Sequence, residues 1–255
     1  MKQILLICVV VMGQSVLAAD DKPLMADPIV EKAIRKSLRK PTGELTKADL
    51  AKVTYLYLYD TKITDAGLKD ISKLQKLRHL GLEKTEITDA GLKEVAKLKF
   101  LTGLRLRYST KITDTGLKDI SKLQGLTYLS LDQTDITDAS LKEVAKFQKL
   151  ETLSLKSTEI TDAGLKEVAK LQKLRFLWLD NTEITDAGLK EVAKLQQLHA
   201  LGLIDTKITD AGLKEVAKLQ KLTYPYLLNT KVTKAGVAEL QKALPKCKIS
   251  SNPTK

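Results

Sequence analysis

The stretch TEITDAGLKEVAKL occupies residues 85–98 and recurs without change at residues 158–171 and 182–195. Related copies begin at Thr61, Thr110, Thr134, Thr206 and, in a more divergent form, Thr230. Successive copies start 24 residues apart, except for one step of 25 residues between Thr85 and Thr110. A fixed period of this length predicts a solenoid, in which each unit buries its apolar face against its neighbours.

Each unit reads as a strand, a turn and a helix. Leu80 and Leu82 alternate with polar or small residues, which is typical of a short, half-buried strand. Thr88 or Asp89 then caps a helix, and the sequence leaves open which of the two does so. An apolar stripe at three-to-four spacing follows up to Leu98. Stacking of such units places all strands in one parallel sheet and all helices on the opposite side.

The pattern LxxLxLxxTxITDxGL resembles the leucine-rich repeat, and it is most similar to the cysteine-containing, ribonuclease-inhibitor-like subclass. The resemblance covers Val53 to Ile249 and implies an α/β fold: a right-handed horseshoe of about eight repeats, with a parallel sheet on the concave face and helices on the convex face. Threonine stands where that subclass often has Cys or Asn. We expect its hydroxyl to hydrogen-bond buried turn backbone in each repeat. This threonine column is Thr61, Thr85, Thr110, Thr134, Thr158, Thr182, Thr206 and Thr230.

The two ends of the array are expected to carry caps, so that the chain divides into residues 1–19, 20–52, 53–233 and 234–255. Asp27 and Pro28 open a helix that runs to about Arg39, and residues 46–49 resemble a capping box. Residues 29–55 are similar to the helical caps of internalin-like bacterial proteins. At the other end we expect a capping helix, an edge strand at residues 247–249 and a short tail.

Residues 1–19 have the features of a secretory signal peptide. Lys2 precedes an apolar run from Ile4 to Met12, and small residues up to Ala19 offer a cleavage site. The alternative is an uncleaved anchor. Cleavage would leave an exported chain that does not span a membrane, in a periplasmic, cell-envelope or extracellular location. Cys247 would be its one cysteine, so that stacking rather than a disulfide supplies stability.

The formal charge of +12 does not indicate a nucleic-acid partner, because acids are interspersed among the lysines of the helical blocks. The two histidines, His79 and His199, lie five repeats apart, about 24 Å in a parallel sheet, too far to share a metal. The aspartate column of the TDAG blocks is better explained by helix capping than by calcium. We therefore expect no metal, no cofactor and no enzymatic activity.

The outward strand positions vary between repeats while the helical block hardly changes. The single tryptophan and all seven tyrosines fall in strands or in the turns just after them, and we expect them on the concave surface. The first candidate binding set comprises Phe176, Trp178, Ala200, Gly202, Ile204, Tyr224 and Tyr226. The second set comprises Tyr55, Tyr57, His79, Arg105, Arg107 and Tyr128.

In the first set, the small residues of one strand lie between aromatic walls that are two strand spacings, about 10 Å, apart. This arrangement predicts an open slot for an extended chain or a sugar ring, since rigidly held aromatics are frequent interface anchors. The alternative is that strand aromatics pair with their neighbours and need no ligand. The extra residue near Tyr108 and Ser109 is expected to form a local bulge.

The function that we expect is that of an exported, non-enzymatic recognition module binding a protein or peptide on its concave face. Leucine-rich repeat families generally do this, so the resemblance implies the partner class and the aromatics indicate the place. One alternative is binding of carbohydrate or a cell-envelope polysaccharide through Trp178 and the tyrosines. The other alternative is a structural spacer without a ligand. The repeat subclass also implies an F-box-type substrate receptor, which conflicts with the signal peptide.

Overall fold

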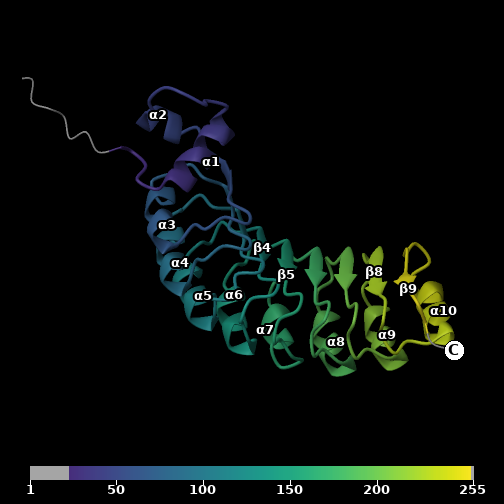
Figure 1. The fold of residues 1–255 in the computed structure, drawn as a ribbon. Coiled ribbons are helices and arrows are strands. Elements are labelled where there is room, and N and C mark those ends of the chain that lie inside the picture. Colours follow the sequence, from purple (N-terminus) through teal and green to yellow (C-terminus); the bar gives the residue numbers. More distant parts are fainter. Residues whose placement is uncertain (1–22, 254–255) are drawn as a thin grey trace, which may run out of the picture.

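The computed structural model describes residues 23–253, and within them the chain forms a curved solenoid (Figure 1). Nine strands form one parallel sheet whose spatial order follows the sequence. The strands are β1 (Tyr55–Tyr57), β2 (His79–Gly81), β3 (Gly103–Arg105), β4 (Tyr128–Ser130), β5 (Thr152–Ser154), β6 (Phe176–Trp178), β7 (Ala200–Gly202), β8 (Tyr224–Leu227) and β9 (Ser250–Ser251). The predicted α/β horseshoe is confirmed. The predicted signal peptide, residues 1–19, lies outside the described residues.

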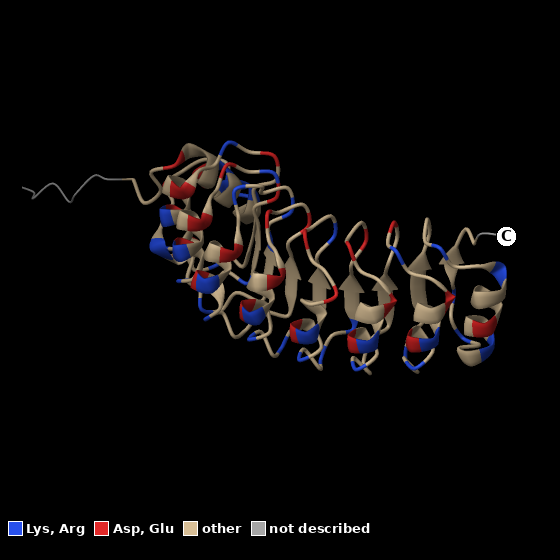
Figure 2. Ribbon diagram, turned by 90° about the horizontal axis from the view of Figure 1, so that it is seen from below, with Lys and Arg blue, Asp and Glu red and all other residues tan. Residues whose placement is uncertain are grey.

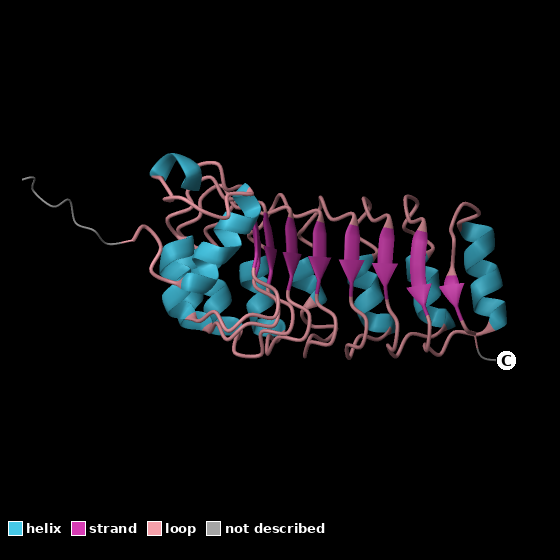
Figure 3. Cartoon of the chain, turned by 45° about the horizontal axis from the view of Figure 1, so that its top comes forward, coloured by secondary structure: helices cyan, strands magenta, loops and turns pink. Residues whose placement is uncertain are grey.

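The helices lie on the outer side of the sheet, and the strands line the inner, concave side (Figure 3). Two helices precede the sheet, α1 (Pro28–Leu38) and α2 (Lys47–Leu50). The repeats contribute α3 (Asp65–Ile71), α4 (Asp89–Val95), α5 (Asp114–Ile120), the 3₁₀ turn η1 (Asp138–Ser140), α6 (Leu141–Val144), α7 (Leu165–Val168), α8 (Asp186–Val192) and α9 (Asp210–Val216). The last helix is α10 (Lys234–Ala243).

The hydrophobic core runs the length of the solenoid between sheet and helices. Leu80 and Leu82 of one repeat are at most 1% exposed, and so are Ile87 and Leu92. These are the positions that the period-two and period-three-to-four patterns predict to face inward. Because every unit buries the same side chains against its two neighbours, the core is continuous along the solenoid. The apolar faces of the two terminal units therefore require capping elements.

The threonine column binds the turn backbone as expected in all repeats but one. In seven repeats the Oγ1 hydroxyl donates to the carbonyl of the leucine three residues earlier, as Thr182 does to Leu179 at 2.6 Å. The prediction is wrong for Thr110, which is exposed. Ser109 occupies the buried position instead, 1% exposed, and its hydroxyl donates to the Leu82 carbonyl of the preceding repeat. Thr110 is therefore the extra residue of the 25-residue repeat.

The aspartate column joins each repeat to the next. Threonine is the N-cap residue of most repeat helices, as Thr185 is for α8, and the aspartate after it lies in the first helical turn. The shorter helices α6 and α7 begin later, after Ser140 and Gly164. Asp162 Oδ1 accepts the Thr185 amide at 2.8 Å, and its Oδ2 accepts the Thr185 hydroxyl. The prediction that the aspartate caps its own helix is thus corrected. The same double contact, which we call the Asp–Thr ladder, links Asp65–Thr88, Asp89–Thr113, Asp114–Thr137, Asp138–Thr161, Asp162–Thr185, Asp186–Thr209 and Asp210–Thr233.

Helix α1 covers the end of the solenoid at which β1 is the edge strand. α1 packs against β1 and α3, and Val30 and Ile34 are its fully buried residues. Asp27 caps α1 as predicted, accepting the amides of Ile29 and Val30, and Arg39 ends the helix in a left-handed conformation with φ 53°. Thr46 and Asp49 form the predicted capping box of α2.

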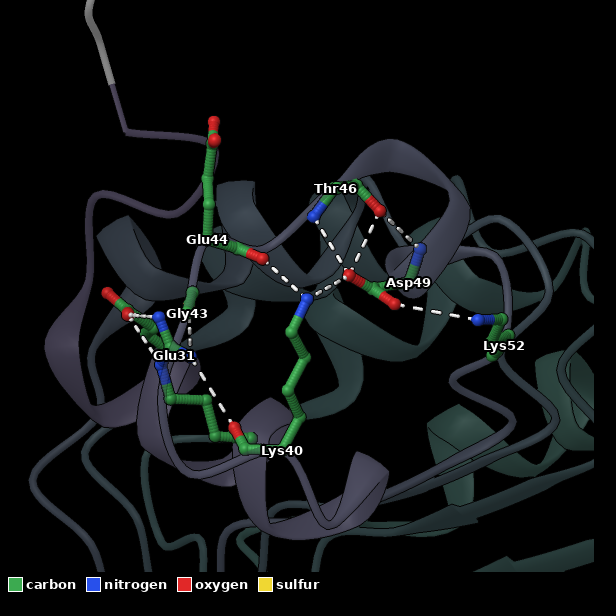
Figure 4. A network of polar contacts seen from close by, with 8 residues as sticks. Glu31, Lys40, Gly43, Glu44, Thr46, Asp49 and Lys52 are labelled. Carbon is green, nitrogen blue, oxygen red and sulfur yellow. Dashed lines mark hydrogen bonds and ion pairs between the residues drawn. The ribbon is translucent and has the colours of Figure 1, made fainter.

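A polar network fixes the loop between α1 and α2 (Figure 4). Lys40 Nζ donates to the Glu44 carbonyl at 2.6 Å and to Asp49 Oδ2 at 2.8 Å. Arg35 spans the same loop by donating to the Gly43 carbonyl at 2.9 Å. Hydrogen bonds from Lys40 and Thr46 hold the pKa of the Asp49 carboxyl well below its usual range.

Asp70 anchors the chain before α1 to the first repeat. It is 4% exposed, and its Oδ2 accepts the amides of Ala26 at 2.6 Å and Asp27 at 2.8 Å. Lys73 pairs with its Oδ1 at 2.6 Å. Burial raises the pKa of this carboxyl, but the hydrogen bonds from Lys73 and from the two amides outweigh burial and hold the pKa below its ordinary value.

At the C-terminal end, α10 is followed by β9 at residues 250–251, three residues later than the start of the predicted edge strand at 247–249. Cys247 is buried, and its thiol donates to the Leu222 carbonyl at 2.8 Å. The Lys248 amide donates to the Thr223 carbonyl at 2.7 Å, and strand pairing with β8 begins at Ser250. Burial raises the pKa of the Cys247 thiol.

The outer face carries mixed charge, as predicted from the helical blocks (Figure 2). Glu191 of α8 and Lys194, just after the helix, form an ion pair at 2.7 Å, and four other repeats contain the equivalent pair. Among residues 23–253, no helix has the length and apolar character that crossing a membrane requires.

Candidate binding surface on the concave face

The strand register aligns the variable side chains in rows across the concave face. Tyr57, Gly81 and Arg105 are direct neighbours in one row, which continues to Trp178, Gly202 and Tyr226 at its far end. A second row begins with Tyr55, His79 and Gly103. The structure thus brings each of the two predicted residue sets onto neighbouring strands.

The rings of Trp178 on β6 and Tyr226 on β8 contact each other over the strand between them. Their centroids are 5.4 Å apart and their planes are inclined by 47°. The prediction of an open slot about 10 Å wide is therefore wrong. The strands do have the expected spacing, but the two side chains lean together above Gly202. What the face presents here is an aromatic surface with Gly202 beneath it.

Gly202 is required by this close approach. A Cβ atom at this position would lie 2.6 Å from Trp178 Cε3 and 2.6 Å from Asp180 Oδ1. Gly81 and Gly103 are covered in the same way, by Tyr57 Cδ1 at 2.7 Å and by His79 Nδ1 at 2.5 Å. These glycines, which in the sequence indicated hollows in the face, are each covered by an aromatic or imidazole ring from the preceding strand.

Charged side chains hold Trp178 from the other side. Lys156 Nζ lies 4.6 Å from the Trp178 ring centroid and 2.6 Å from Asp180 Oδ2. Asp180 is 8% exposed, and its Oδ1 accepts the Ile204 amide at 2.9 Å. The tryptophan is therefore packed between Lys156 and Tyr226, a cation–π contact on one flank and an aromatic contact on the other.

Apolar side chains continue the aromatic surface toward the C-terminal end. Tyr224 is 40% exposed, and Ile204 and Leu228 are partly exposed. Ala200 is 3% exposed and lies on the floor of the face. Phe176 is partly exposed beside His199, with ring centroids 6.4 Å apart. We call Trp178, Ile204, Tyr224, Tyr226 and Leu228 the C-terminal aromatic surface. Leu228 was not among the predicted binding residues, although it stands at the same position of its repeat as the predicted Ile204.

The N-terminal half of the concave face is more polar. Tyr55 stacks on His79 with a centroid distance of 4.7 Å and an interplanar angle of 5°. Burial lowers the pKa of His79, and the positive charges of Arg105 and Arg78 lower it further. Tyr55 and Tyr57 are each 49% exposed, so this cluster is not sealed beneath the N-terminal helices.

Arg105 occupies the centre of this half. Its guanidinium carbon lies over the Tyr57 ring at 5.6 Å and over the Tyr128 ring at 5.2 Å. A cavity of about 110 Å³ opens beside it, lined by Tyr57, His79, Leu80, Gly103, Arg105 and Tyr128. Burial raises the pKa of Tyr128, whose hydroxyl therefore stays protonated and can donate.

Arg107 is separate from this cavity. It packs on its own neighbour, with its guanidinium carbon 4.5 Å from the Tyr108 ring centroid and a hydrogen bond of 2.7 Å to the Tyr108 hydroxyl. Tyr108 adopts the left-handed backbone conformation, φ 62°, as the residue at this turn does in every repeat. Residues 23–253 contain no cluster of three or more His, Cys, Asp or Glu side chains that could hold a metal ion.

The sequence matches two family models. One, described as a leucine-rich repeat region, matches residues 104–250, more than half of the chain, and the other, described as a leucine-rich repeat, matches residues 73–96. The chain belongs to the leucine-rich repeat family. No curated protein sequence matches this leucine-rich repeat protein.

Solved structures are similar over most of the leucine-rich repeat protein. Internalin C2 of Listeria monocytogenes is 26% identical, with a TM-score of 0.69, over 91% of this chain and 95% of that one. A leucine-rich repeat protein of Leptospira interrogans is 25% identical, with a TM-score of 0.60, over 81% of this chain and 51% of that one. Internalin F of L. monocytogenes is 22% identical, with a TM-score of 0.64, over 91% of this chain and 78% of that one, and this shows the fold alone. The predicted internalin-like, leucine-rich repeat architecture is confirmed.

Proposed function

We propose that this chain is an exported, non-enzymatic recognition module that binds a protein or peptide through the concave face of its solenoid. A leucine-rich repeat fold is typical of a protein-interaction module rather than of an enzyme. The proposal places the principal contact on the C-terminal aromatic surface, with Phe176 beside it and with Ala200 and Gly202 as its floor. Export is proposed from the sequence features of residues 1–19.

The observation that carries the proposal is the preformed geometry of this surface. The side chains of Trp178 and Tyr226 are already packed together, so binding would order few additional groups. Ile204 and Leu228 extend the partly exposed apolar area over the neighbouring strands. A rigid aromatic pair within an apolar patch has the features of a protein-binding anchor.

The geometry favours a protein or peptide over a carbohydrate. Stacking of a sugar needs a free ring face, and Trp178 has Lys156 on one flank and Tyr226 on the other. A structural spacer without a ligand would not require partly exposed aromatics on the concave side, since single polar residues satisfy the same strand positions in β5.

The test is a selection of peptides displayed on phage against the purified chain, followed by binding measurements. We expect selected peptides to bind at least tenfold more weakly to the Trp178→Ala and Tyr226→Ala variants. Phe100→Ala is the matched control, because Phe100 is 54% exposed and lies in the loop after α4, outside the strands. Circular dichroism establishes that the variants remain folded. Selected peptides that bind the variants as tightly as the parent chain would exclude this surface as the binding site.

A further inference from the structure

The guanidinium of Arg105 lies between two tyrosine rings and is partly exposed. Its carbon lies 5.6 Å from the Tyr57 centroid and 5.2 Å from the Tyr128 centroid, and the side chain is 46% exposed. A guanidinium beside aromatic rings gains a cation–π attraction and can still offer in-plane N–H donors to a planar anion. The two tyrosines therefore fix the position from which Arg105 can donate.

No protein carboxylate takes up these donors within the described residues. Glu83 is the acid that pairs with Arg105, and its Oε1 lies 3.8 Å from Arg105 Nη1, which is too long for a hydrogen bond. A guanidinium has five N–H donors arranged to match a carboxylate in a bidentate contact. The side chain is thus positioned and charged, and it lines the cavity beside it.

The size of the cavity selects a single small group. Its volume of about 110 Å³ corresponds to about four water molecules. Pockets for drug-sized ligands are several times larger, about 300–1,000 Å³. Gly103 lines the cavity next to the His79 ring, which a Cβ at residue 103 would meet at 2.5 Å.

The local charge favours a monoanion. Burial lowers the pKa of His79, and the charges of Arg105 and Arg78 lower it further, so that its ring adds no positive charge at neutral pH. Glu83, 3.8 Å from Arg105, repels any anion placed there, and it repels a phosphate dianion more strongly than a carboxylate monoanion. We propose that this cavity binds a carboxylate of the recognised peptide, either an Asp or Glu side chain or the chain terminus. That the carboxylate belongs to a peptide rests on the proposed function. The binding of a carboxylate at Arg105 can be tested independently of it.

The position of the cavity specifies the spacing of the ligand. Arg105 is on β3 and Trp178 is on β6, with Gly202 on β7 next in order. Three to four strand spacings span about 14–19 Å, which an extended chain covers with about four to six residues. A peptide that reached both places would carry its carboxylate about five residues from its apolar anchor.

Nuclear magnetic resonance of the full chain tests the site with small probes. N-acetyl-glutamate amide supplies a side-chain carboxylate, N-acetyl-alanine supplies a terminal one, and N-acetyl-glutamine amide is the neutral control. We expect at least one carboxylate probe to shift the Arg105 Nε–H and His79 ring signals with saturation in the millimolar range. The stronger of the two probes identifies the source. The neutral probe should leave both signals unchanged.

Two variants locate the response. Arg105→Gln should abolish saturation, seen at His79, while Arg107→Gln should preserve it, because Arg107 packs on Tyr108 away from the cavity. Arg105→Lys keeps the charge but loses the planar fork, and we expect at least fivefold weaker binding. Equal shifts from the neutral probe, or saturation that survives Arg105→Gln, would overturn the proposal. Trp178→Ala should leave binding of the carboxylate probes unchanged. Peptide binding to the variants of the C-terminal aromatic surface therefore tests the proposed function, and probe binding at Arg105 tests the carboxylate site independently.

Discussion

The ring of Trp178 rests against the ring of Tyr226, two strands away, and Gly202 on the intervening strand lies beneath the contact. Parallel strands in register place the three residues in one row. Because the middle residue has no side chain, the outer two can lean together until their centroids are 5.4 Å apart. The partly exposed tryptophan is thereby fixed in one orientation before any partner arrives.

Gly202→Ala is expected to disrupt this contact. The added methyl group would lie 2.6 Å from Trp178 Cε3, so the indole must rotate or shift. We expect a loss of about 1–3 kcal/mol in the free energy of unfolding, the usual cost of overpacking. The change would be measured by urea unfolding and by the emission spectrum of the single tryptophan.

A double variant separates ring displacement from other effects of the alanine. When Trp178 is already alanine, adding Gly202→Ala should cost less than it does in the parent chain, since the ring it would displace is gone. Additive losses in the two variants would contradict the proposed role of Gly202 as the seat of the indole.

Asp186→Ala should destabilise the chain by more than Glu191→Ala does, although both residues belong to α8. Asp186 accepts the amide of Thr209 at 2.9 Å and its hydroxyl at 2.6 Å, and its loss leaves both donors without this acceptor. Such a loss costs about 1–3 kcal/mol. Glu191 makes an ion pair with Lys194, worth about 0–1 kcal/mol at a surface. Urea unfolding of the two variants gives the comparison, and equal losses would show that the Asp–Thr ladder contributes little.

Acid is expected to release the segment before α1 through Asp70. The pKa of Asp70 in the folded chain lies below its unfolded value of 3.8. Its stabilising contribution is therefore fully present above that unfolded value and is lost as the pH falls through the lower, folded pKa. Hydrogen exchange of the Ala26 and Asp27 amides, which Asp70 accepts, should accelerate relative to the core over this range. In Asp70→Asn the exchange should already be fast at neutral pH, and protection that persists in this variant would assign the anchoring to other contacts.

His79 should titrate below pH 6.5, its unperturbed value. Burial and the charges of Arg105 and Arg78 disfavour its protonated form in the folded chain, so the folded state binds fewer protons than the unfolded state. The resulting stability is present above the unfolded pKa and declines as the pH falls from there toward the folded pKa. The ring proton shifts report the pKa directly. Arg105→Gln should raise the pKa of His79 toward its ordinary value. An unchanged pKa would show that the charge of Arg105 does not act on His79.

The sequence predicts the frame of this molecule well because the frame repeats. Leu80 and Leu82 alternate, and Leu92 lies on the helical stripe, so eight copies of one pattern indicate the same buried positions. The caps also follow local rules, as at Asp27 for α1 and at Thr46 for α2. These features depend on residues close together in the chain, which a single sequence displays.

The concave face was predicted less well because its side chains interact across strands. The sequence placed Trp178 and Tyr226 on opposite walls, and only the structure shows that they meet over Gly202. The same limitation applies to Asp162, which appeared to cap its own helix and instead accepts from Thr185 of the next repeat. The position of the extra residue, Thr110 rather than Ser109, could not be chosen from the sequence because both carry hydroxyl groups.

The Asp–Thr ladder has a consequence for how such an array can change in length. Every link joins the same residue of one unit to the same residue of the next, as Asp162 does to Thr185 and Asp186 to Thr209. When a whole unit is duplicated or lost, the new junction contains the same two partners as the old one. Residues 158–171 and 182–195 are identical, so a unit taken from either place would meet the same junction residues. The concave surface can therefore grow or shrink by steps of about 4.8 Å, one strand at a time, while both caps and every internal junction keep the contacts they already have.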